Sequence, residues 1–547
     1  MIASFVKREA SKKYESDAMV GQPSGKIVLM DQNEESLMLP DDEHNRTLIG
    51  NVHPANWVNP EPVGRYNIVV IGAGTAGLIT AVIAASLGAK VALIEKHLMG
   101  GDCLNVGCVP SKGLIRAARA WADLRNAAEF GLQIPAGVKY DFGAVMARMR
   151  KLRARISHND SVHRYTKLGV DVYIGSGRFT GADTIQVEGP AGNRILTFAK
   201  AAVCTGARAS TPPTPGLKEA GYLTNETVFS LTELPLRIGV IGAGPIGCEL
   251  AQSFARFGSQ VYLIETSHGI MPKEDRDAAE IVEQQMLRDG VKLLCCGKGL
   301  KINKTDNGKR LTVDSHGQQY DVTVDEILVG VGRTPNVEGI GLEAVGVEHD
   351  KNGVKVNERL QTTNPRIYAA GDICSPYKFT HAADAMAQIV IQNALFPHPF
   401  GLGYASVESL IMPWCTFTEP EVAHVGMYEK DAKEKGIEVE TYTFKLDEVD
   451  RAILDGEDEG FARVHIQKGT DKIVGATIVA AHAGEIIGEF SVAMKAGGGA
   501  KTIAGTIHPY PTQAEVNKKV VNLWRKEHFT PRTKSLLMKL FAWTRRG

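Results

Sequence analysis

One arrangement of residues occurs twice in this chain of 547 residues and restricts its fold more than any other feature. In each copy an apolar run leads into a glycine-rich turn, an apolar stretch of helical length and a second apolar run. The runs are 66–71 with 90–95, and 237–241 with 260–265. The glutamate that closes each unit lies 23 positions after its first glycine, at Glu95 and Glu265. Continuous apolar runs are typical of parallel strands buried on both faces. The repeat therefore predicts an α/β chain with two Rossmann-like dinucleotide-binding domains.

The first glycine turn has the composition that a bound dinucleotide requires. Gly72 allows the tight bend from strand to helix, Gly74 lets a pyrophosphate approach the backbone, and Gly77 lets the helix pack on the strand. The helix N-terminus then faces the phosphates, and Glu95 can accept hydrogen bonds from ribose hydroxyls. Glycine-rich turns also occur for packing alone, but a complete strand–helix–strand unit with its acid favours a nucleotide site.

The second glycine turn, with Gly242, Gly244 and Gly247, predicts a second nucleotide. Its identity depends on Glu265, because a 2′-phosphate normally requires an arginine near this point and none follows closely. A carboxylate would also repel that phosphate. These residues favour NADH as the cofactor. The alternative is NADPH, with Glu265 turned to solvent and Lys273 binding the phosphate.

Two cysteines, Cys103 and Cys108, follow the first unit. Pro110 suits the first turn of a helix, so Cys108 is expected at or just before a helix N-terminus. The helix dipole and the free N–H groups there stabilise a thiolate. Two buried and inert cysteines are the alternative, but their position directly after a nucleotide-binding unit favours a redox-active pair.

The composition limits the partners and the setting of the chain. Lys plus Arg and Asp plus Glu both number 62, and this zero net charge favours neither nucleic acid nor an anionic membrane as a bulk partner. The eight cysteines are too few for a disulfide-stapled secreted scaffold. With no apolar signal core and no run long enough to cross a membrane, we expect a cytoplasmic protein. The adjacent Cys295 and Cys296 lie in a strand-like run and are interpreted as packing residues rather than metal ligands.

Residues 100–112, GGDCLNVGCVPSK, resemble the active-site segment of the class I pyridine nucleotide–disulfide oxidoreductases. That family includes dihydrolipoamide dehydrogenase, glutathione reductase and mercuric reductase. Further similar segments extend the resemblance from about residue 65 to about residue 520, the last being the start of a dimerisation domain at 413–421. The resemblance implies that Gly206, Gly371 and Asp372 help to bind FAD, and that Gly332 helps to bind NAD(P)H.

The resemblance also implies a homodimer with FAD on the first unit and NAD(P)H on the second. Electrons would pass from nicotinamide through flavin to a disulfide of Cys103 and Cys108. Cys108 would be the flavin-side thiolate, and Cys103 the thiol that attacks the substrate. Lys112 and Glu249 match the family's ion pair beside the flavin. Residues 508–515 would be donated to this site by the partner subunit.

The C-terminal motif departs from that of the disulfide-reducing members. Those members carry a catalytic histidine, oriented by a glutamate, where this chain has Tyr510, while His508 and Glu515 match the rest of the motif. Tyrosine, with an ordinary pKa of about 10, is a poor proton shuttle at neutral pH. The motif resembles that of a mercuric-reductase-like subgroup, which implies a soft metal ion such as Hg(II), held transiently by Cys103 and Cys108.

Two features of mercuric reductases are absent from the sequence, namely a C-terminal cysteine pair and an N-terminal CxxC domain. A disulfide substrate, as in dihydrolipoamide dehydrogenase, is therefore the alternative. Two further classes stay open. One is a membrane-docked electron-transfer module that uses the C-terminal tail. The other is a scaffold protein without redox chemistry, against which the intact cysteines, Lys112 and Glu249 argue.

The motifs predict a division of the chain into six parts. These are a flexible extension and lead-in (1–64), a first FAD portion (65–217), an NAD(P) domain (218–338), a second FAD portion (339–403), an α+β dimerisation domain (404–525) and a tail (526–547). The tail contains the apolar segment 535–543 between basic residues. It is interpreted as a terminal helix that packs on the dimer, or else as a helix on a membrane surface.

Overall fold

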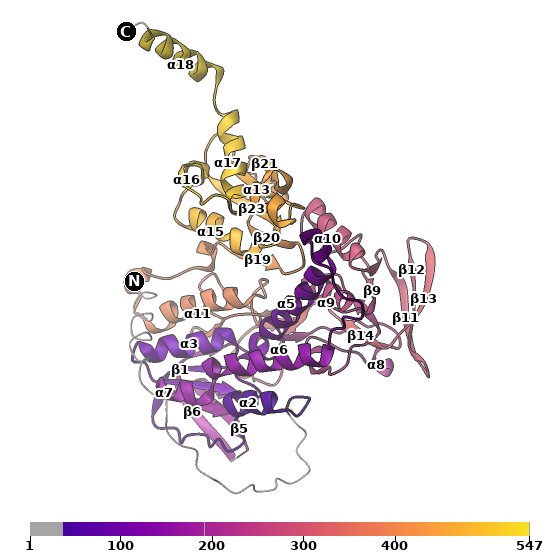
Figure 1. Ribbon diagram of the computed structural model, residues 1–547. Helices are drawn as coiled ribbons and strands as arrows, with labels where there is room; N and C mark the ends of the chain where they lie inside the picture. The colour runs from indigo at the N-terminus through magenta and orange to yellow at the C-terminus, as the bar shows by residue number, and fades with distance from the viewer. Residues whose placement is uncertain (1–36, 191, 546–547) are drawn as a thin grey trace, which may run out of the picture.

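The computed structural model describes residues 37–190 and 192–545. The predicted flexible extension over residues 1–36 lies outside the described residues. Figure 1 shows two α/β regions side by side and a third region above them, from which the last helix projects. This arrangement confirms the predicted fold class of two dinucleotide-binding domains and a C-terminal α+β dimerisation domain.

The first domain is built on a seven-stranded sheet. Its strands are β1 (Arg65–Ile71), β2 (Val91–Glu95), β3 (Val170–Ile174), β4 (Ser176–Gly181), β5 (Thr184–Gly189), β6 (Gly192–Val203) and β18 (Ile367–Ala369). The order is β3-β2-β1-β6-β5-β4, with β18 also paired to β6. The pairings among β1, β2, β3, β6 and β18 are parallel, whereas β4 with β5 and β5 with β6 pair antiparallel. Because β18 joins this sheet, residues far apart in the sequence form one domain.

Helices cover the first sheet and carry the cysteine segment. They are α3 (Thr75–Ser86), α4 (Gly101–Asn105), α5 (Cys108–Arg125), α6 (Phe142–Ser157), α7 (Val162–Lys167) and α11 (Thr380–Leu395). The helices α3 and α11 pack together against the sheet. All of β2 and the last four residues of β1 are buried, as continuous apolar runs predict. The observed bounds of β1 and β2 agree with the predicted runs 66–71 and 90–95 to within one residue.

The lead-in before the first sheet contains a helix that the sequence analysis did not predict, α2 (Glu43–Val52). The Asp42 carboxylate caps it by accepting a hydrogen bond from the Asn45 N–H at 2.8 Å. Leu48 and Val52, one helical turn apart, are fully buried. Residues 43–52 are therefore a folded part of the first domain and not a flexible lead-in. Further along, Trp57 donates a hydrogen bond to the Val172 carbonyl at 3.2 Å, so this stretch also packs on the first domain.

The second domain combines a parallel sheet with an antiparallel one. The parallel sheet has the order β10-β9-β8-β14, with β8 (Arg237–Ile241), β9 (Gln260–Ile264), β10 (Val291–Leu294) and β14 (Glu326–Val329). The antiparallel sheet consists of β11 (Lys298–Thr305), β12 (Gly308–Ser315) and β13 (Gln318–Val324). The helices are α8 (Leu217–Ala220), α9 (Pro245–Arg256) and α10 (Arg276–Arg288). A two-stranded ribbon, β7 (Ala207–Ala209) with β15 (Arg333–Pro335), lies where the chain passes between the domains. A second short pair is β16 (His349–Asp350) with β17 (Gly353–Val354).

The C-terminal region is an antiparallel sheet covered by helices. Its strand order is β19-β20-β23-β22-β21, with β19 (Pro413–Thr416), β20 (Glu421–Gly426), β21 (Val439–Lys445), β22 (Phe461–Gln467) and β23 (Ile473–Ala480). Its helices are α12 (Glu429–Glu434), α13 (Asp450–Asp455), α14 (Ala483–Ile486), α15 (Gly488–Lys495), α16 (Ala500–Gly505) and α17 (Glu515–Glu527). The last helix, α18 (Pro531–Thr544), buries no residue and stands away from the rest of the chain (Figure 1).

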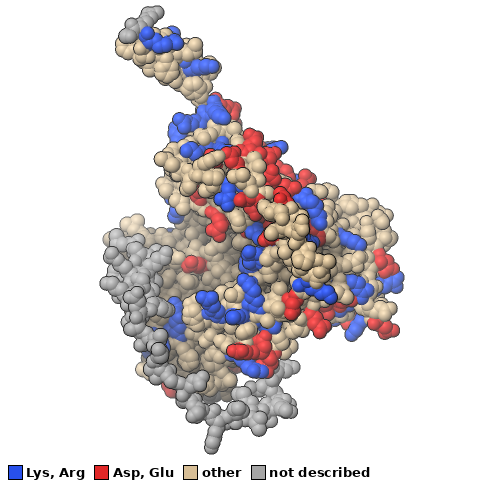
Figure 2. Space-filling view, in the orientation of Figure 1, with Lys and Arg blue, Asp and Glu red and all other residues tan. Residues whose placement is uncertain are grey.

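Charged side chains of both signs are interspersed over the visible face of the three regions (Figure 2). The projecting α18 differs, because it carries lysine and arginine but no acidic residue. Among the described residues, no helix is both long and apolar enough to cross a membrane.

Candidate active site

The first glycine turn has the geometry of a phosphate cradle. Gly72 has a φ of 100°, and a Cβ there would lie 2.4 Å from the Cys204 carbonyl oxygen. A Cβ at Gly77 would lie 1.8 Å from the Gly72 carbonyl oxygen, so the close helix–strand packing requires glycine there as well. At Gly74 the nearest atom to a Cβ is 3.8 Å away, which leaves this backbone open to a ligand. The residues present fit the pyrophosphate of a dinucleotide such as FAD at the N-terminus of α3.

The glutamate that follows the first turn is fixed by the backbone. Glu95 accepts hydrogen bonds from the Ala73 N–H at 2.7 Å and from the His97 N–H at 2.8 Å. Burial raises the pKa of its carboxyl group above the usual value. The carboxylate is thus held at the end of β2, where the sequence predicted a ribose contact.

The second glycine turn has nearly the same backbone geometry as the first. Gly242 has a φ of 100°, a Cβ at Gly247 would lie 1.9 Å from the Gly242 carbonyl oxygen, and a Cβ at Gly244 would meet nothing within 4 Å. Glu265 accepts from the Ala243 N–H at 2.8 Å and from the Thr266 N–H at 2.7 Å. Burial acts to raise the pKa of Glu265, but these backbone hydrogen bonds outweigh it and lower the pKa. Glu265 is therefore a fixed carboxylate beside the second cradle.

One cleft of about 2610 Å³ joins the two cradles. This volume is well above the roughly 300–1,000 Å³ of a pocket for one small ligand, so the cleft has room for two dinucleotides. Its lining includes nearly all of the predicted cofactor and redox residues: Gly72, Gly74, Glu95, Cys103, Cys108, Lys112, Gly206, Gly242, Gly244, Glu249, Glu265, Gly332, Gly371 and Asp372.

The two cysteines lie on consecutive helices beside this cleft. Cys103 is in α4, and Cys108 is the first residue of α5, as Pro110 led us to expect. Both are free thiols, and Cys108 is the more exposed of the two. The Cys108 sulfur also lies 3.4 Å from the Thr380 hydroxyl at the start of α11. Three helix ends therefore meet at the pair.

The two thiols differ in acidity. A hydrogen bond from Cys103 lowers the pKa of Cys108 to about 6, with Thr380 and the Lys112 charge adding to the effect against the burial of the sulfur. The same contact with Cys108, together with burial, raises the pKa of Cys103. At neutral pH the reduced pair therefore holds Cys108 as a thiolate and Cys103 as its hydrogen-bond donor.

The predicted ion pair is formed, and it connects all three regions of the chain. The Lys112 ammonium on α5 donates to the Glu249 carboxylate on α9 at 2.9 Å. The other carboxylate oxygen of Glu249 accepts from the Phe417 N–H at 2.9 Å, just after β19. The Lys112 nitrogen also lies 4.4 Å from the centre of the Phe417 ring. Glu249 is buried, so the pair holds Lys112 in place beside the cleft.

A half-buried arginine connects the cysteine segment to the second FAD motif. Arg333 donates to the carboxylate of Asp102, the neighbour of Cys103, and its Nε lies 3.3 Å from the Asp372 carboxylate. Burial raises the pKa of Asp372. The glycines beside these groups, Gly206 with φ 67° and Gly371 with φ 83°, adopt left-handed backbone conformations. The cleft is thus lined by residues from widely separated parts of the chain.

The C-terminal motif is not brought to the cysteine pair of its own chain. Tyr510 is 70% exposed, and its hydroxyl donates to the Asp450 carboxylate at 2.8 Å. Asp450, and not the predicted Glu515, is therefore the carboxylate that holds Tyr510. His508 pairs with Glu489 at 3.0 Å. The hydrogen bond to Asp450 raises the pKa of Tyr510, which keeps the hydroxyl protonated.

Three site residues were missed by the sequence analysis: Thr380, Asp450 and Glu489. Thr380 lies 272 positions from the cysteine it contacts. The two carboxylates lie 60 and 19 positions before their partners. No motif or spacing connects such residues, and only the packing of separate elements brings them together.

Comparisons with known proteins agree with this geometry. The model of the pyridine nucleotide-disulphide oxidoreductase family matches residues 66–388, and that of the family's dimerisation domain matches residues 412–521. A mercuric reductase of Staphylococcus aureus is 34% identical over 453 residues, which cover 83% of this chain and 81% of that protein. A dihydrolipoyl dehydrogenase of Bacillus subtilis (strain 168) is 32% identical over 463 residues, which cover 82% of this chain and 96% of that protein.

Solved structures show the same likeness. The Cu(II) complex of the HOCl-induced flavoprotein disulfide reductase RclA from Escherichia coli superposes with a TM-score of 0.73 at 28% identity, over 84% of this chain and 100% of that chain. LpdA from Mycobacterium tuberculosis gives a TM-score of 0.75 at 25% identity over the same shares. The family's cofactors, FAD and NAD(P)H, correspond to the two cradles described above. The chain belongs to the pyridine nucleotide–disulfide oxidoreductase family and is an NAD(P)H-dependent flavoprotein oxidoreductase.

Proposed function

We propose that Cys103 and Cys108 are the redox-active pair of this enzyme and deliver electrons to a soft metal ion, with a disulfide as the alternative substrate. One observation carries the proposal. The thiol with the lowered pKa, Cys108, starts a helix at the wall of the cleft that both nucleotide cradles share. Bound FAD and NAD(P)H supply the two electrons that reduce the pair.

Different residues of the protein stabilise the Cys108 thiolate and position the two cysteines. Two electrons and one proton open the disulfide, leaving Cys108 as a thiolate and Cys103 as a thiol at neutral pH. The Thr380 hydroxyl and the charge of Lys112 stabilise the Cys108 thiolate. The buried Glu249 keeps Lys112 in position and balances its charge. The Asp102–Arg333 contact fixes the segment that carries Cys103.

The side chain at position 510 supports a metal ion over a disulfide. A disulfide substrate leaves as two thiols, and the departing thiolate needs a proton donor with a pKa near neutrality. Tyr510, whose pKa is raised by Asp450, is a poor donor for that step. A soft divalent ion needs no such donor, because two thiolates bind it with release of the remaining proton. The two electrons of the pair then reduce the ion to the metal as Cys103 and Cys108 return to the disulfide. The relative from Staphylococcus aureus is a mercuric reductase, which agrees with this chemistry.

We further propose a homodimer in which Tyr510 of one subunit lies at the cysteine pair of the other. Tyr510 is exposed, and none of His508, Tyr510 and Glu515 lines the cleft of its own chain. The chain also contains the family's dimerisation domain, over residues 412–521. For the nucleotide, the fixed carboxylate of Glu265 supports NADH over NADPH.

The decisive assay follows NADH oxidation by the flavin-loaded enzyme with three acceptors: a Hg(II)–thiol complex, lipoamide and glutathione disulfide. We expect the Hg(II) complex to be the best of the three, and Cys103→Ser to abolish its reduction. Cys374→Ser, a half-buried cysteine outside the cleft lining, is the matched control and should keep full activity. An acceptor reduced equally well by wild type and Cys103→Ser would mean that electrons leave by another route.

A further inference from the structure

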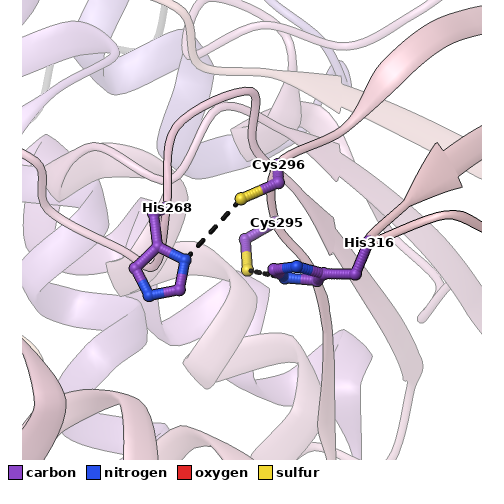
Figure 3. A group of neighbouring side chains, drawn as sticks. All are labelled: His268, Cys295, Cys296 and His316. Atoms are coloured by element: carbon purple, nitrogen blue, oxygen red, sulfur yellow. Dashed lines mark hydrogen bonds between the residues drawn. The ribbon is translucent and has the colours of Figure 1, made fainter.

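Four metal-binding side chains converge in the second domain, away from the cleft: His268, Cys295, Cys296 and His316 (Figure 3). They come from three separate segments. His268 lies in the loop after β9, the two cysteines follow the end of β10, and His316 lies in the turn between β12 and β13. Each side chain offers one ligand atom, and these four atoms all lie within 4.8 Å of one another.

The distances between the ligand atoms suit a tetrahedral ion. The Cys295 sulfur lies 3.2 Å from the His316 Nε2, and the Cys296 sulfur lies 3.6 Å from the His268 Nδ1. Around a tetrahedral Zn²⁺ with ordinary bond lengths, neighbouring ligand atoms are about 3.3–3.8 Å apart. The two imidazole rings are nearly perpendicular, at 89° with centroids 6.0 Å apart, and each one faces a sulfur (Figure 3). Small rotamer adjustments are therefore enough to bring all four atoms around one ion.

The backbone at the cysteines does not follow the pattern of a packed strand. Consecutive side chains in a strand point to opposite faces, so Cys295 and Cys296 would point apart if β10 continued through them. Instead β10 ends at Leu294, and Cys296 has a φ of 55°. This left-handed conformation is costly for a residue with a side chain and is found mainly at functional sites. It turns both sulfurs toward the two histidines, and this supports metal binding over the interpretation of the pair as packing residues.

The three segments are also connected to one another without an ion. The Ser315 hydroxyl donates to the Cys295 carbonyl at 2.6 Å, which joins the β12–β13 turn to the cysteines. The Cys296 N–H donates to the Ser267 carbonyl at 2.9 Å, which joins the cysteines to the loop of His268. Cys295 is buried, Cys296 is half-buried and both histidines are exposed, so the site lies at the surface with one sulfur in the interior. The ligands are thus held in place before any ion binds.

We propose that His268, Cys295, Cys296 and His316 form a four-coordinate metal site that binds one Zn²⁺ per chain. Two thiolates and two imidazoles are a common ligand set for a closed structural zinc site. Oxygen-ligand ions such as Mg²⁺ and Ca²⁺ are excluded by this chemistry, whereas Cu⁺ and Hg²⁺ share the preference for sulfur. The site is separate from Cys103 and Cys108, because none of its four residues lines the cleft.

The position of this site connects it to nucleotide binding. His268 comes three residues after Glu265, and the Ser267 N–H between them donates to the Glu265 carboxylate at 3.0 Å. From the other side, the Gly297 N–H donates to the Glu265 carbonyl at 2.8 Å. An ion bound at the four ligands therefore stiffens both segments that hold Glu265. This consequence rests on the proposed role of Glu265 in binding NADH.

The first experiment measures Zn²⁺ binding to the flavin-loaded Cys103→Ser/Cys108→Ser enzyme by chelator competition, so that the active-site thiols do not contribute. We expect one tightly bound Zn²⁺ per chain. Replacing any one ligand, as in His268→Ala, Cys295→Ser, Cys296→Ser or His316→Ala, should weaken binding at least about 100-fold, since loss of even a second-shell partner costs about 10–100-fold. The matched controls, Cys374→Ser and His349→Ala, change residues outside the cluster and should leave the affinity unchanged.

Two further readouts separate a lost ligand from a misfolded domain. Cys296→His replaces the thiolate with an imidazole, which can also bind the ion. This variant should retain most of the affinity that Cys296→Ser loses. Co²⁺ in the site should give the strong visible absorption of tetrahedral thiolate coordination, at wavelengths beyond the flavin bands. Binding that survives Cys295→Ser and Cys296→Ser, or that does not respond to either histidine substitution, would overturn the four-ligand site. The same four-residue dependence with Cu⁺ or Hg²⁺ in place of Zn²⁺ would support the site and identify a softer ion as its occupant.

The coupling to the nucleotide is tested on wild-type enzyme by comparing the zinc-loaded and zinc-free forms. We expect removal of Zn²⁺ to raise the KM for NADH several-fold while kcat stays the same. Equal KM values would overturn the coupling but not the site. Because metal affinity is measured without turnover, failure of the proposed reductase activity would leave the binding result intact.

Discussion

At the scale of single residues, the proposed electron transfer depends on how two neighbouring thiols share one proton. The dipole of α5 and the charge of Lys112 favour ionisation of Cys108, whereas the Thr380 hydroxyl lowers the pKa of both cysteines. The hydrogen bond between the two sulfurs then lowers one pKa and raises the other. In the proposed function, this asymmetry makes Cys108 the resident thiolate and leaves Cys103 as the thiol that meets the substrate.

The asymmetry predicts the pH dependence of alkylation in the reduced enzyme. The rate at Cys108 should rise with pH around a midpoint of about 6, because its thiolate forms there instead of near the ordinary pKa of 9.0. Cys103→Ala removes the hydrogen-bond donor and should move the midpoint up toward the ordinary value. Cys103→Ser keeps a donor and should hold the midpoint low. Peptide mapping after iodoacetamide labelling measures the rate, and a midpoint near 9 in the wild type would contradict the assignment.

The identity of residue 510 predicts a change of acceptor. Tyr510→His introduces a group with a pKa near about 6.5, which can protonate a leaving thiolate at neutral pH. We expect it to raise kcat with lipoamide at least about tenfold, because a positioned acid–base group is worth about 10²–10⁴ in rate. Tyr510→Phe is the control and should show no such gain. Steady-state kinetics with both variants decide the point, and an unchanged lipoamide rate in Tyr510→His would remove position 510 from the proton transfer.

At the scale of elements, buried polar contacts anchor the helix that carries Cys103. Arg153 on α6 is almost fully buried, and its two terminal nitrogens donate to the Asn105 carbonyl at 2.5 Å and to the Asn45 amide oxygen at 2.7 Å. Burial lowers the pKa of Arg153 to about 10, yet the group stays charged at neutral pH. The helix α2, which supplies Asn45, therefore stabilises α4 through one arginine.

Removing one partner of this arginine should destabilise the fold. Asn45→Ala leaves a buried charged donor without its acceptor, and we expect the free energy of unfolding to fall by about 1–3 kcal/mol. Arg46→Ala on the same helix breaks only the exposed ion pair with Asp41, which solvent screens, and should lower the free energy of unfolding much less. Urea unfolding of the two variants measures the difference. Equal losses would mean that Arg153 does not depend on α2.

The sequence predicts the parts of this molecule that are encoded locally. The glycine turns, Glu95, Glu265 and the start of α5 at Cys108 follow from residue types at short spacing, and the structure has them where the sequence indicates. The helix α2 was missed because only Leu48 and Val52 on its apolar side are fully buried, which is a weak periodic signal. Thr380 and the four-residue metal cluster were missed for another reason: their partners come from segments far apart in the sequence that only the tertiary fold brings together.

At the scale of the whole molecule, no residue of the C-terminal helix is buried against the rest of the described chain. The apolar residues Leu536, Phe541 and Trp543 on α18 are 68%, 56% and 72% exposed. The helix directly follows α17 of the dimerisation domain. Its surroundings therefore favour a second copy of this chain as the partner that covers α18.

Deleting residues 530–547 should accordingly weaken the homodimer. We expect the dissociation constant to rise at least about tenfold, which corresponds to about 1.4 kcal/mol of lost contact free energy. Analytical ultracentrifugation measures this change, with the replacement of Lys534 and Lys539 by glutamine as a control that keeps the apolar residues. Unchanged dimerisation, with sedimentation of the full chain on anionic vesicles, would instead identify α18 as a membrane-surface helix.

The central claim, that electrons reach the substrate through Cys103 and Cys108, is tested most directly by counting thiols. The chain has eight cysteines, and the oxidised enzyme should therefore present two fewer free thiols than the reduced enzyme. The measurement treats the oxidised, flavin-loaded enzyme with one equivalent of NADH without oxygen, quenches it with acid and labels the thiols under denaturing conditions. The account predicts two new thiols per chain, mapped to Cys103 and Cys108, and none in Cys103→Ser. Consumption of NADH with no new thiol at these positions would contradict it.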